Sequence, residues 1–62
     1  MNNKLYICTW VSEDESEVFC GCVWADHYVI DSEINEVKFY DANGLYISVM
    51  PDCNNVRGFY IG

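Results

Sequence analysis

The sequence predicts a small all-β fold, and two observations indicate this class. Apolar residues alternate with polar residues along most of the chain, which is the period of a half-buried strand. β-branched and aromatic residues dominate these segments, and no segment keeps a helical apolar stripe for three turns. We expect residues 1–62 to form a single compact acidic β domain. Its expected architecture is a single-sheet meander or partly open barrel of five to six antiparallel strands.

Six segments carry the strand pattern, and short turns separate them. They are residues 4–12, 17–25, 28–31, 36–41, 45–50 and 57–61. Residues 32–35, with the sequence Ser-Glu-Ile-Asn, are long enough for one helical turn at most. Pro51 directly follows the fifth segment, where its missing N–H removes no hydrogen bond from the sheet.

The first hairpin is expected to turn at Asp14 and Glu15. This centre sets three cross-strand pairs: Val11 with Val18, Thr9 with Cys20, and Ile7 with Cys22. The same register places Trp10 directly opposite Phe19, as an aromatic pair on the other face.

Two turns are compatible with the segment Asp41-Ala42-Asn43-Gly44. A two-residue turn at Asn43-Gly44 sets one group of pairs: Phe39 with Ser48 and Tyr40 with Ile47. A type I turn with Gly44 in a bulge sets another: Phe39 with Ile47 and Val37 with Val49. A shift by one residue moves every side chain to the other face of the sheet. We predict the bulged turn, because it collects the apolar residues on one face.

Continuing the alternation along the chain assigns the apolar residues to two faces. The expected core face carries Leu5, Ile7, Val11, Val18, Cys20, Cys22, Trp24, Tyr28, Ile30, Val37, Phe39, Leu45, Ile47 and Val49, joined by Phe59 and Ile61. The opposite face carries Tyr6, Cys8, Trp10, Phe19, Val23, Val29, Tyr40, Tyr46 and Tyr60, with Tyr40 facing Tyr46. One sheet without a helix covers only one face. The aromatic face therefore either stays in water or is buried by a partner.

The length limits the stability of such a fold. A chain of this mass exposes roughly 4,100 Å² when folded. Burial of apolar surface stabilises it by about 95 kcal/mol, and ordering the chain costs about 93 kcal/mol. The expected net stability is therefore small.

Charge is the most distinctive feature of the composition. Three Lys and Arg residues and ten Asp and Glu residues give a net charge of −7, which argues against direct binding to nucleic acid or to an anionic membrane. One window without Lys or Arg contains eight acids: Glu13, Asp14, Glu15, Glu17, Asp26, Asp31, Glu33 and Glu36. These acids either keep the turns solvated or present carboxylates to a basic groove of a partner.

Catalytic and metal chemistry have little support in the sequence. His27 is the only histidine, and no nucleophile motif or phosphate-binding glycine loop is present. The segment Cys20-Gly21-Cys22, together with His27 and Cys53, offers zinc ligands, but the Cys-x-Cys spacing does not match a zinc knuckle. A regular strand points both thiols of this segment to one face, which favours cysteine as a small buried hydrophobe. We expect no enzyme activity, no cofactor and no metal.

The first residues, Met1-Asn2-Asn3-Lys4, lead into a mixed strand and not into a long apolar run. No secretory signal is visible there, so we expect a cytoplasmic location with reduced thiols.

In size, charge and missing catalytic motifs, the chain resembles the small acidic inhibitors made by phages and mobile elements. Some of those inhibitors block CRISPR effectors by imitating DNA. The resemblance implies a non-enzymatic inhibitor that occupies the basic nucleic-acid-binding surface of a target protein. We expect the eight acids to form the contact, with Trp10 and Phe19 as apolar anchors. Two alternatives stay open: an antitoxin or immunity protein that neutralises a basic toxin, and a homo-oligomer subunit, such as a homodimer, assembled through the aromatic face.

Overall fold

The computed structural model describes residues 3–61, and this part of the chain folds into six strands. They are β1 (Lys4–Val11), β2 (Glu17–Ala25), β3 (His27–Asp31), β4 (Glu36–Tyr40), β5 (Tyr46–Pro51) and β6 (Asn55–Ile61). The all-β class is confirmed, and every strand lies within two residues of its expected bounds. Residues 32–35 form a turn and not a helical turn. Within the described residues, no helix is long and apolar enough to span a membrane.

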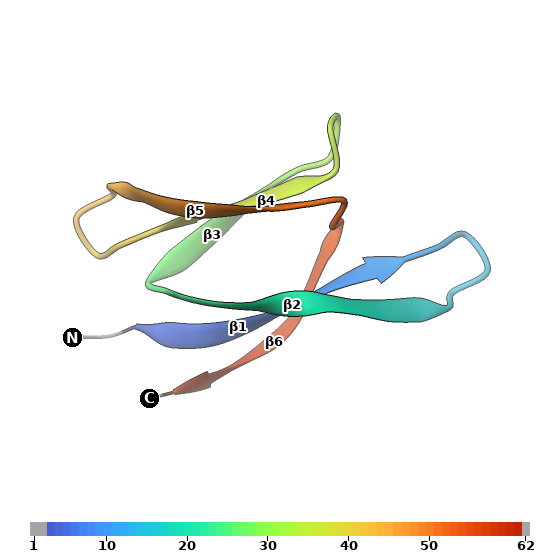
Figure 1. Ribbon diagram of the computed structural model, residues 1–62, viewed down its shortest axis with the longest axis horizontal. Coiled ribbons are helices and arrows are strands. Elements are labelled where there is room, and N and C mark those ends of the chain that lie inside the picture. The colour runs from blue at the N-terminus through green and yellow to red at the C-terminus, as the bar shows by residue number, and fades with distance from the viewer. Residues whose placement is uncertain (1–2, 62) are drawn as a thin grey trace.

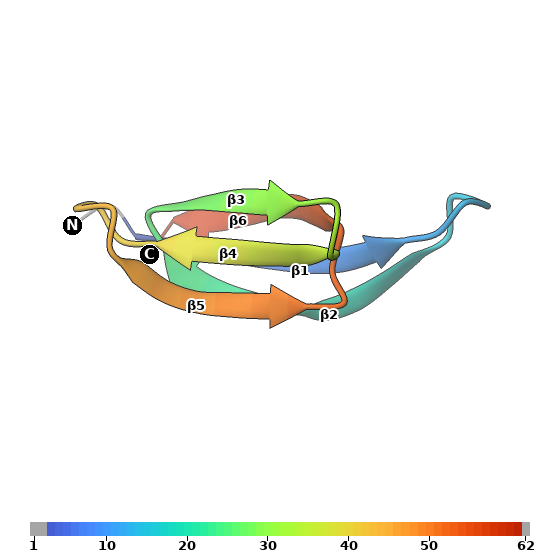
Figure 2. The ribbon, with the colours of Figure 1, turned by 90° about the horizontal axis from the view of Figure 1, so that it is seen from above.

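The strands form two antiparallel sheets, which corrects the expectation of a single sheet (Figure 1). One sheet has the strand order β2-β1-β6, and the other has the order β3-β4-β5. The chain passes between the sheets at Asp26, a one-residue link from β2 to β3, and again at residues 52–54. Seen from above, the second sheet lies over the first (Figure 2). Each sheet therefore covers one face of the other.

The core lies between the two central strands, β1 and β4. The buried hydrophobic residues are Tyr6, Cys8, Ala25, Val37, Phe39 and Cys53, and Cys20, Val23, Met50 and Val56 pack against them. The ring of Tyr6 lies 5.9 Å from that of Phe39 across the interface. The exposed area is 4287 Å², close to the roughly 4,100 Å² expected for this mass.

The predicted faces are right for β4 and wrong for most of β5. Met50 lies opposite the buried Val37, so Val49, which was predicted in the core, faces outward opposite Lys38. Val37 and Phe39 on β4 are fully buried. Tyr40 pairs with Tyr46, as predicted, on the outer face of this sheet.

In β1 and in residues 21–25 of β2 the predicted faces are reversed, whereas Phe59 of β6 lies opposite Tyr6 on the inward face, as predicted. Tyr6 and Cys8 point into the core, and the alternation therefore places Leu5 and Ile7 outside. The cause is the link at Asp26. Ala25 faces the core, and the next inward residue is Tyr28, three positions later, whose ring lies 5.1 Å from that of Tyr6. A pattern continued through Asp26 without this shift inverts β1 and residues 21–25 of β2.

A bulge in β2 changes the register of the first hairpin. Ile7 pairs with Cys22, as predicted, but the register shifts between Cys8 and Thr9. Beyond the shift, the observed pairs are Thr9 with Phe19, Trp10 with Val18, and Val11 with Glu17. The predicted pairs of Val11 with Val18 and Thr9 with Cys20 are therefore wrong, and Trp10 does not face Phe19. Because Cys20 is the extra residue, it packs against the core while Cys22 is exposed.

The second hairpin has the expected turn but a second irregularity. The N–H of Gly44 donates to the carbonyl of Asp41 at 3.0 Å, and Gly44 has φ 81°, as a type I turn with a bulge requires. The register shifts again between Phe39 and Tyr40. It therefore pairs Phe39 with Ser48 and Val37 with Met50, where Ile47 and Val49 were predicted.

The small core makes Phe39 the position where truncation should cost most. We expect Phe39→Ala to lower the free energy of unfolding by about 3–5 kcal/mol, enough to unfold most molecules of a chain this small. Leu45→Ala is the matched control, because Leu45 is 65% exposed; its effect should stay within about 0.5 kcal/mol. Urea unfolding followed by circular dichroism measures both. Equal midpoints for the two variants would contradict this core assignment.

Candidate functional site

The antiparallel topology collects most of the predicted acids at one end of the molecule. The loops of residues 12–16, 32–35 and 52–54 lie at this end, whereas the link between β2 and β3 and the turn of residues 41–45 lie at the other (Figure 1). We call the first the acidic end. It comprises Glu13, Asp14, Glu15, Glu17, Asp31, Glu33, Glu36 and Asp52. Seven of the eight predicted acids are therefore brought to one end, and Asp26 is not.

Asp14 fixes the turn between β1 and β2. Its Oδ1 accepts hydrogen bonds from Ser12 Oγ at 2.5 Å, from Ser16 Oγ at 2.7 Å and from Ser16 N at 3.1 Å. These bonds, that of Ser12 first, lower the pKa of Asp14 from 3.8 to about 2. Glu13 and Glu15 on either side are exposed. The turn therefore presents three carboxylates from a hydrogen-bonded backbone.

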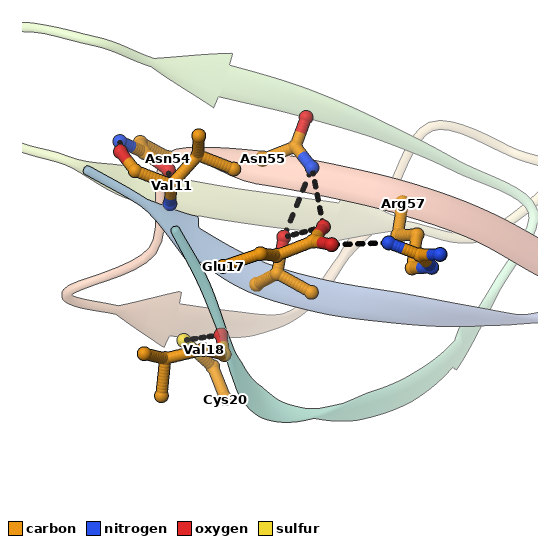
Figure 3. A network of polar contacts seen from close by, with 8 residues as sticks. Val11, Glu17, Val18, Cys20, Asn54, Asn55 and Arg57 are labelled. Atoms are coloured by element: carbon orange, nitrogen blue, oxygen red, sulfur yellow. Dashed lines mark hydrogen bonds and ion pairs between the residues drawn. The ribbon is translucent and has the colours of Figure 1, made fainter. Parts of the chain in front are cut away.

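Glu17 has a different role from the acids of the turn (Figure 3). Its Oε2 accepts a hydrogen bond from Thr9 Oγ1 at 2.9 Å, and its Oε1 pairs with the guanidinium of Arg57. Asn55 Nδ2 donates to Thr9 Oγ1 at 2.9 Å. The network joins all three strands of the first sheet. Glu17 is therefore held within the sheet, and its charge is partly neutralised.

The other loops of the acidic end are joined to each other. The turn between β3 and β4 carries Asp31, whose Oδ1 accepts from the N–H of Glu33 at 3.1 Å. The carbonyl of Asn35 in this turn accepts from the N–H of Cys53 at 2.9 Å. Asn54 closes the end of β1, with its side chain bonded to both N and O of Val11 at 2.8 and 2.9 Å. These bonds hold the acidic loops in fixed positions.

Asp26 belongs to the corner between the sheets. Its carbonyl accepts from Tyr6 Oη at 2.9 Å and from Lys4 Nζ at 3.4 Å. Its carboxylate lies 3.0 Å from His27 Nδ1. The ring of His27 stacks on that of Tyr40 with centroids 5.4 Å apart. Sequence reasoning grouped Asp26 with the other acids because the window was read along the chain, whereas the fold separates them.

A second candidate surface lies on the outer face of the first sheet. We call it the apolar sheet face; it consists of Leu5, Ile7, Phe19, Cys22, Trp24 and Tyr60. Register places Trp24 and Tyr60 on either side of Leu5, and these two rings are 50% and 65% exposed. Phe19, 65% exposed, extends the face toward the acidic end. Trp10 is half-buried and pairs with Val18, so it lies on the inward side and does not share a surface with Phe19.

All four cysteines are free thiols, and no group of three or more His, Cys, Asp or Glu side chains within residues 3–61 has the geometry of a metal site. No protein-family model matches the chain, and searches of curated proteins and of solved structures give no significant match.

The hydrogen bonds to Asp14 generate a prediction about pH. Because the folded pKa is lowered, the ionised carboxylate favours the folded state above about pH 3.8, and this contribution is lost as the pH falls toward 2. We expect Ser12→Ala to move the pKa of Asp14 back toward 3.8. An NMR titration of the Asp14 carboxyl carbon measures the shift in both proteins. An unchanged pKa in the variant would contradict the role of Ser12.

Proposed function

We propose that this chain is a non-enzymatic binding protein that inhibits a nucleic-acid-binding protein by covering its basic surface with the acidic end. The observation that carries the proposal is the gathering of seven predicted acids around loops at one end. Of the three bases, Arg57 pairs with Glu17, Lys4 lies at the opposite end, and Lys38 lies in the middle of β4, outside the loops. The electrostatic potential at the acidic end is therefore negative, as binding to a basic groove requires.

Order in the loops supports imitation of a phosphate backbone. DNA presents a negative charge about every 1.7 Å along its axis, at positions fixed by the duplex. The bonds of Asp14 to Ser12 and Ser16, and that of Cys53 to Asn35, fix the carboxylate-bearing loops before any partner arrives. Preorganised charges lose less conformational entropy on binding than charges on a free tail.

The class of target follows from this chemistry. A protein that binds nucleic acid has a basic groove, and an acidic inhibitor of phage or mobile-element origin, as a DNA mimic of the anti-CRISPR kind, fits it. An antitoxin that neutralises a basic toxin uses the same electrostatics. Capture separates the two: immobilised protein, exposed to a lysate of the source cells, retains partners for identification by mass spectrometry. If the chain is a DNA mimic, added duplex DNA should compete for the partner's groove and release the partner from the immobilised protein. A toxin without a nucleic-acid groove would stay bound.

The acidic end generates a matched pair of charge variants. Glu13→Lys with Glu33→Lys changes two exposed acids of the acidic end and leaves Glu17 and Asp14 in place. The control variant, Asp26→Lys with Ala42→Lys and Asn43→Lys, raises the net charge of −7 by the same amount at the other end. We expect the first variant to associate with the captured partner at least about tenfold more slowly at low salt, with a flatter salt dependence.

The control variant should keep most of the parent's association rate. Circular dichroism must show the same β spectrum for both, so that a loss of folding is not read as a loss of binding. Equal slowing by the two variants would mean that only total charge matters, and the acidic end would then not be the contact surface.

The apolar sheet face supports a second candidate function, a subunit that assembles into a homodimer. Trp24 and Tyr60 expose large rings in one row of this face, and aromatic residues of this kind anchor protein interfaces. A second copy that covers this row would remove it from water.

The homodimer generates its own salt prediction. An apolar contact does not depend on salt, and screening only weakens the repulsion between like-charged copies. Light scattering should therefore give the dimer mass at low salt and again at high salt. Trp24→Ser should weaken the dimer by about tenfold or more. Val29→Ser is the control, because Val29 is 52% exposed on the outer face of the other sheet. A monomer mass at both salt concentrations would contradict this candidate.

A further inference from the structure

Three of the four thiols meet inside the molecule, where neither candidate function uses them. Cys8 and Cys53 are fully buried in the core, and Cys20 packs against it. The thiol of Cys53 donates to the carbonyl of Thr9 at 3.2 Å, and Cys53 and Cys8 belong to the one buried cluster against which Cys20 packs. Cys20 Sγ contacts the carbonyl of Asp52 at 3.7 Å, one residue before Cys53.

Two irregular backbone features produce this cluster. The bulge turns Cys20 inward opposite Cys8, whereas a regular strand would point it outward beside Cys22. The link of residues 52–54 then places Cys53 against the end of β1, where the N–H of Asn54 donates to Thr9 O at 3.3 Å. Cys22, two positions from Cys20, is exposed on the other face of the sheet.

We propose that Cys20 and Cys53 form a thiol–disulfide exchange site whose substrates are small-molecule disulfides such as oxidised glutathione. Cys20 is the entry thiol, because it is only half-buried at the edge of the core. Cys53 is the resolving thiol, because it is buried in the cluster against which Cys20 packs and directly follows Asp52, whose carbonyl Cys20 Sγ contacts. Cys8 is fully buried and has no access to a substrate.

The reaction has two displacement steps. The thiolate of Cys20 attacks one sulfur of the substrate, breaks its S–S bond and releases one thiolate. The thiolate of Cys53 then attacks the Cys20 sulfur of the mixed disulfide and releases the second. The two protein thiols lose two electrons and two protons, and the substrate disulfide gains them to become two thiols. A surrounding excess of reduced thiol reverses both steps.

Burial, and then the neighbouring thiol of Cys53, raise the pKa of Cys20 above its usual value. Only a small fraction of this thiol is ionised at neutral pH. The exchange should therefore accelerate close to tenfold per pH unit between about pH 7 and 8.5, because the thiolate is the attacking species.

The product joins β2 to the link between β5 and β6, across the two sheets. It closes a long loop of the chain, which restricts the unfolded state. We expect the midpoint of thermal unfolding to rise by roughly 10 °C or more in the oxidised protein, given the steep dependence of the midpoint on stability in small domains.

The experiment incubates the reduced protein with oxidised glutathione at about pH 8, where a larger fraction of each thiol is ionised than at neutral pH. Intact mass and peptide mapping then follow. We expect the internal Cys20–Cys53 disulfide, seen as the loss of two hydrogen atoms, and reversal by dithiothreitol. Cys22→Ser is the matched control: it should keep the internal disulfide and lose any glutathione adduct at residue 22. Cys20→Ser should abolish the internal disulfide while preserving the β spectrum.

Three outcomes would overturn the proposal. The parent protein could yield only glutathione adducts, Cys20→Ser could still form an internal disulfide, or mapping could place the disulfide at Cys22. None of these outcomes bears on the acidic end, so the exchange site and the proposed inhibitor function fail independently.

Discussion

The rest of the structure depends on the corner at Asp26. A single residue carries the chain from the first sheet to the second, and its backbone is held on both sides: its N–H donates to Tyr40 O at 3.0 Å, and its carbonyl accepts from Tyr6 Oη at 2.9 Å. This corner makes two layers out of one meander. It also shifts the alternation by one residue, which decides that Tyr6 and Cys8 form the core while Leu5 and Ile7 face outward.

The two-layer arrangement has a consequence for the surface. Two three-stranded layers enclose one thin core, and both outer faces stay uncovered. The sequence is as apolar as that of a larger domain, with 52% hydrophobic residues, so rings such as Trp24 and Tyr60 are left outside. Exposed apolar groups in one row are a common property of interfaces and an unusual one for a monomer.

The strands could be predicted from the alternation and residue types along the chain. Features that depend on contacts between residues distant in sequence could not. The Asp41–Gly44 turn was predictable, since it depends on neighbouring residues. The pair of Ile7 with Cys22 agrees with the prediction because the bulge at Cys20 offsets the one-residue error in the predicted register next to the turn. The bulge at Cys20 was not predictable, because a classic bulge needs no glycine and leaves no mark in the alternation. The network of Glu17 with Thr9 and Arg57 joins strands distant in sequence, so no window along the chain could reveal it. The gathering of the acids was predicted because they lie close together along the chain. The exclusion of Asp26 was not predicted, because it depends on where the fold places that residue.

The fold separates the two candidate surfaces along its length. The row of Trp24, Leu5 and Tyr60 lies where β2 and β6 end, at the opposite end from the acidic loops. The eight residues of β1 that span this distance extend for about 26 Å at roughly 3.3 Å per residue. That length exceeds the Debye length of about 8–10 Å near physiological salt, so the charges of the acidic end act weakly on the apolar row. A second copy seated on that row would therefore meet little of the repulsion that a net charge of −7 suggests. A basic partner at the acidic end would in turn find its surface free, so one molecule can carry both contacts.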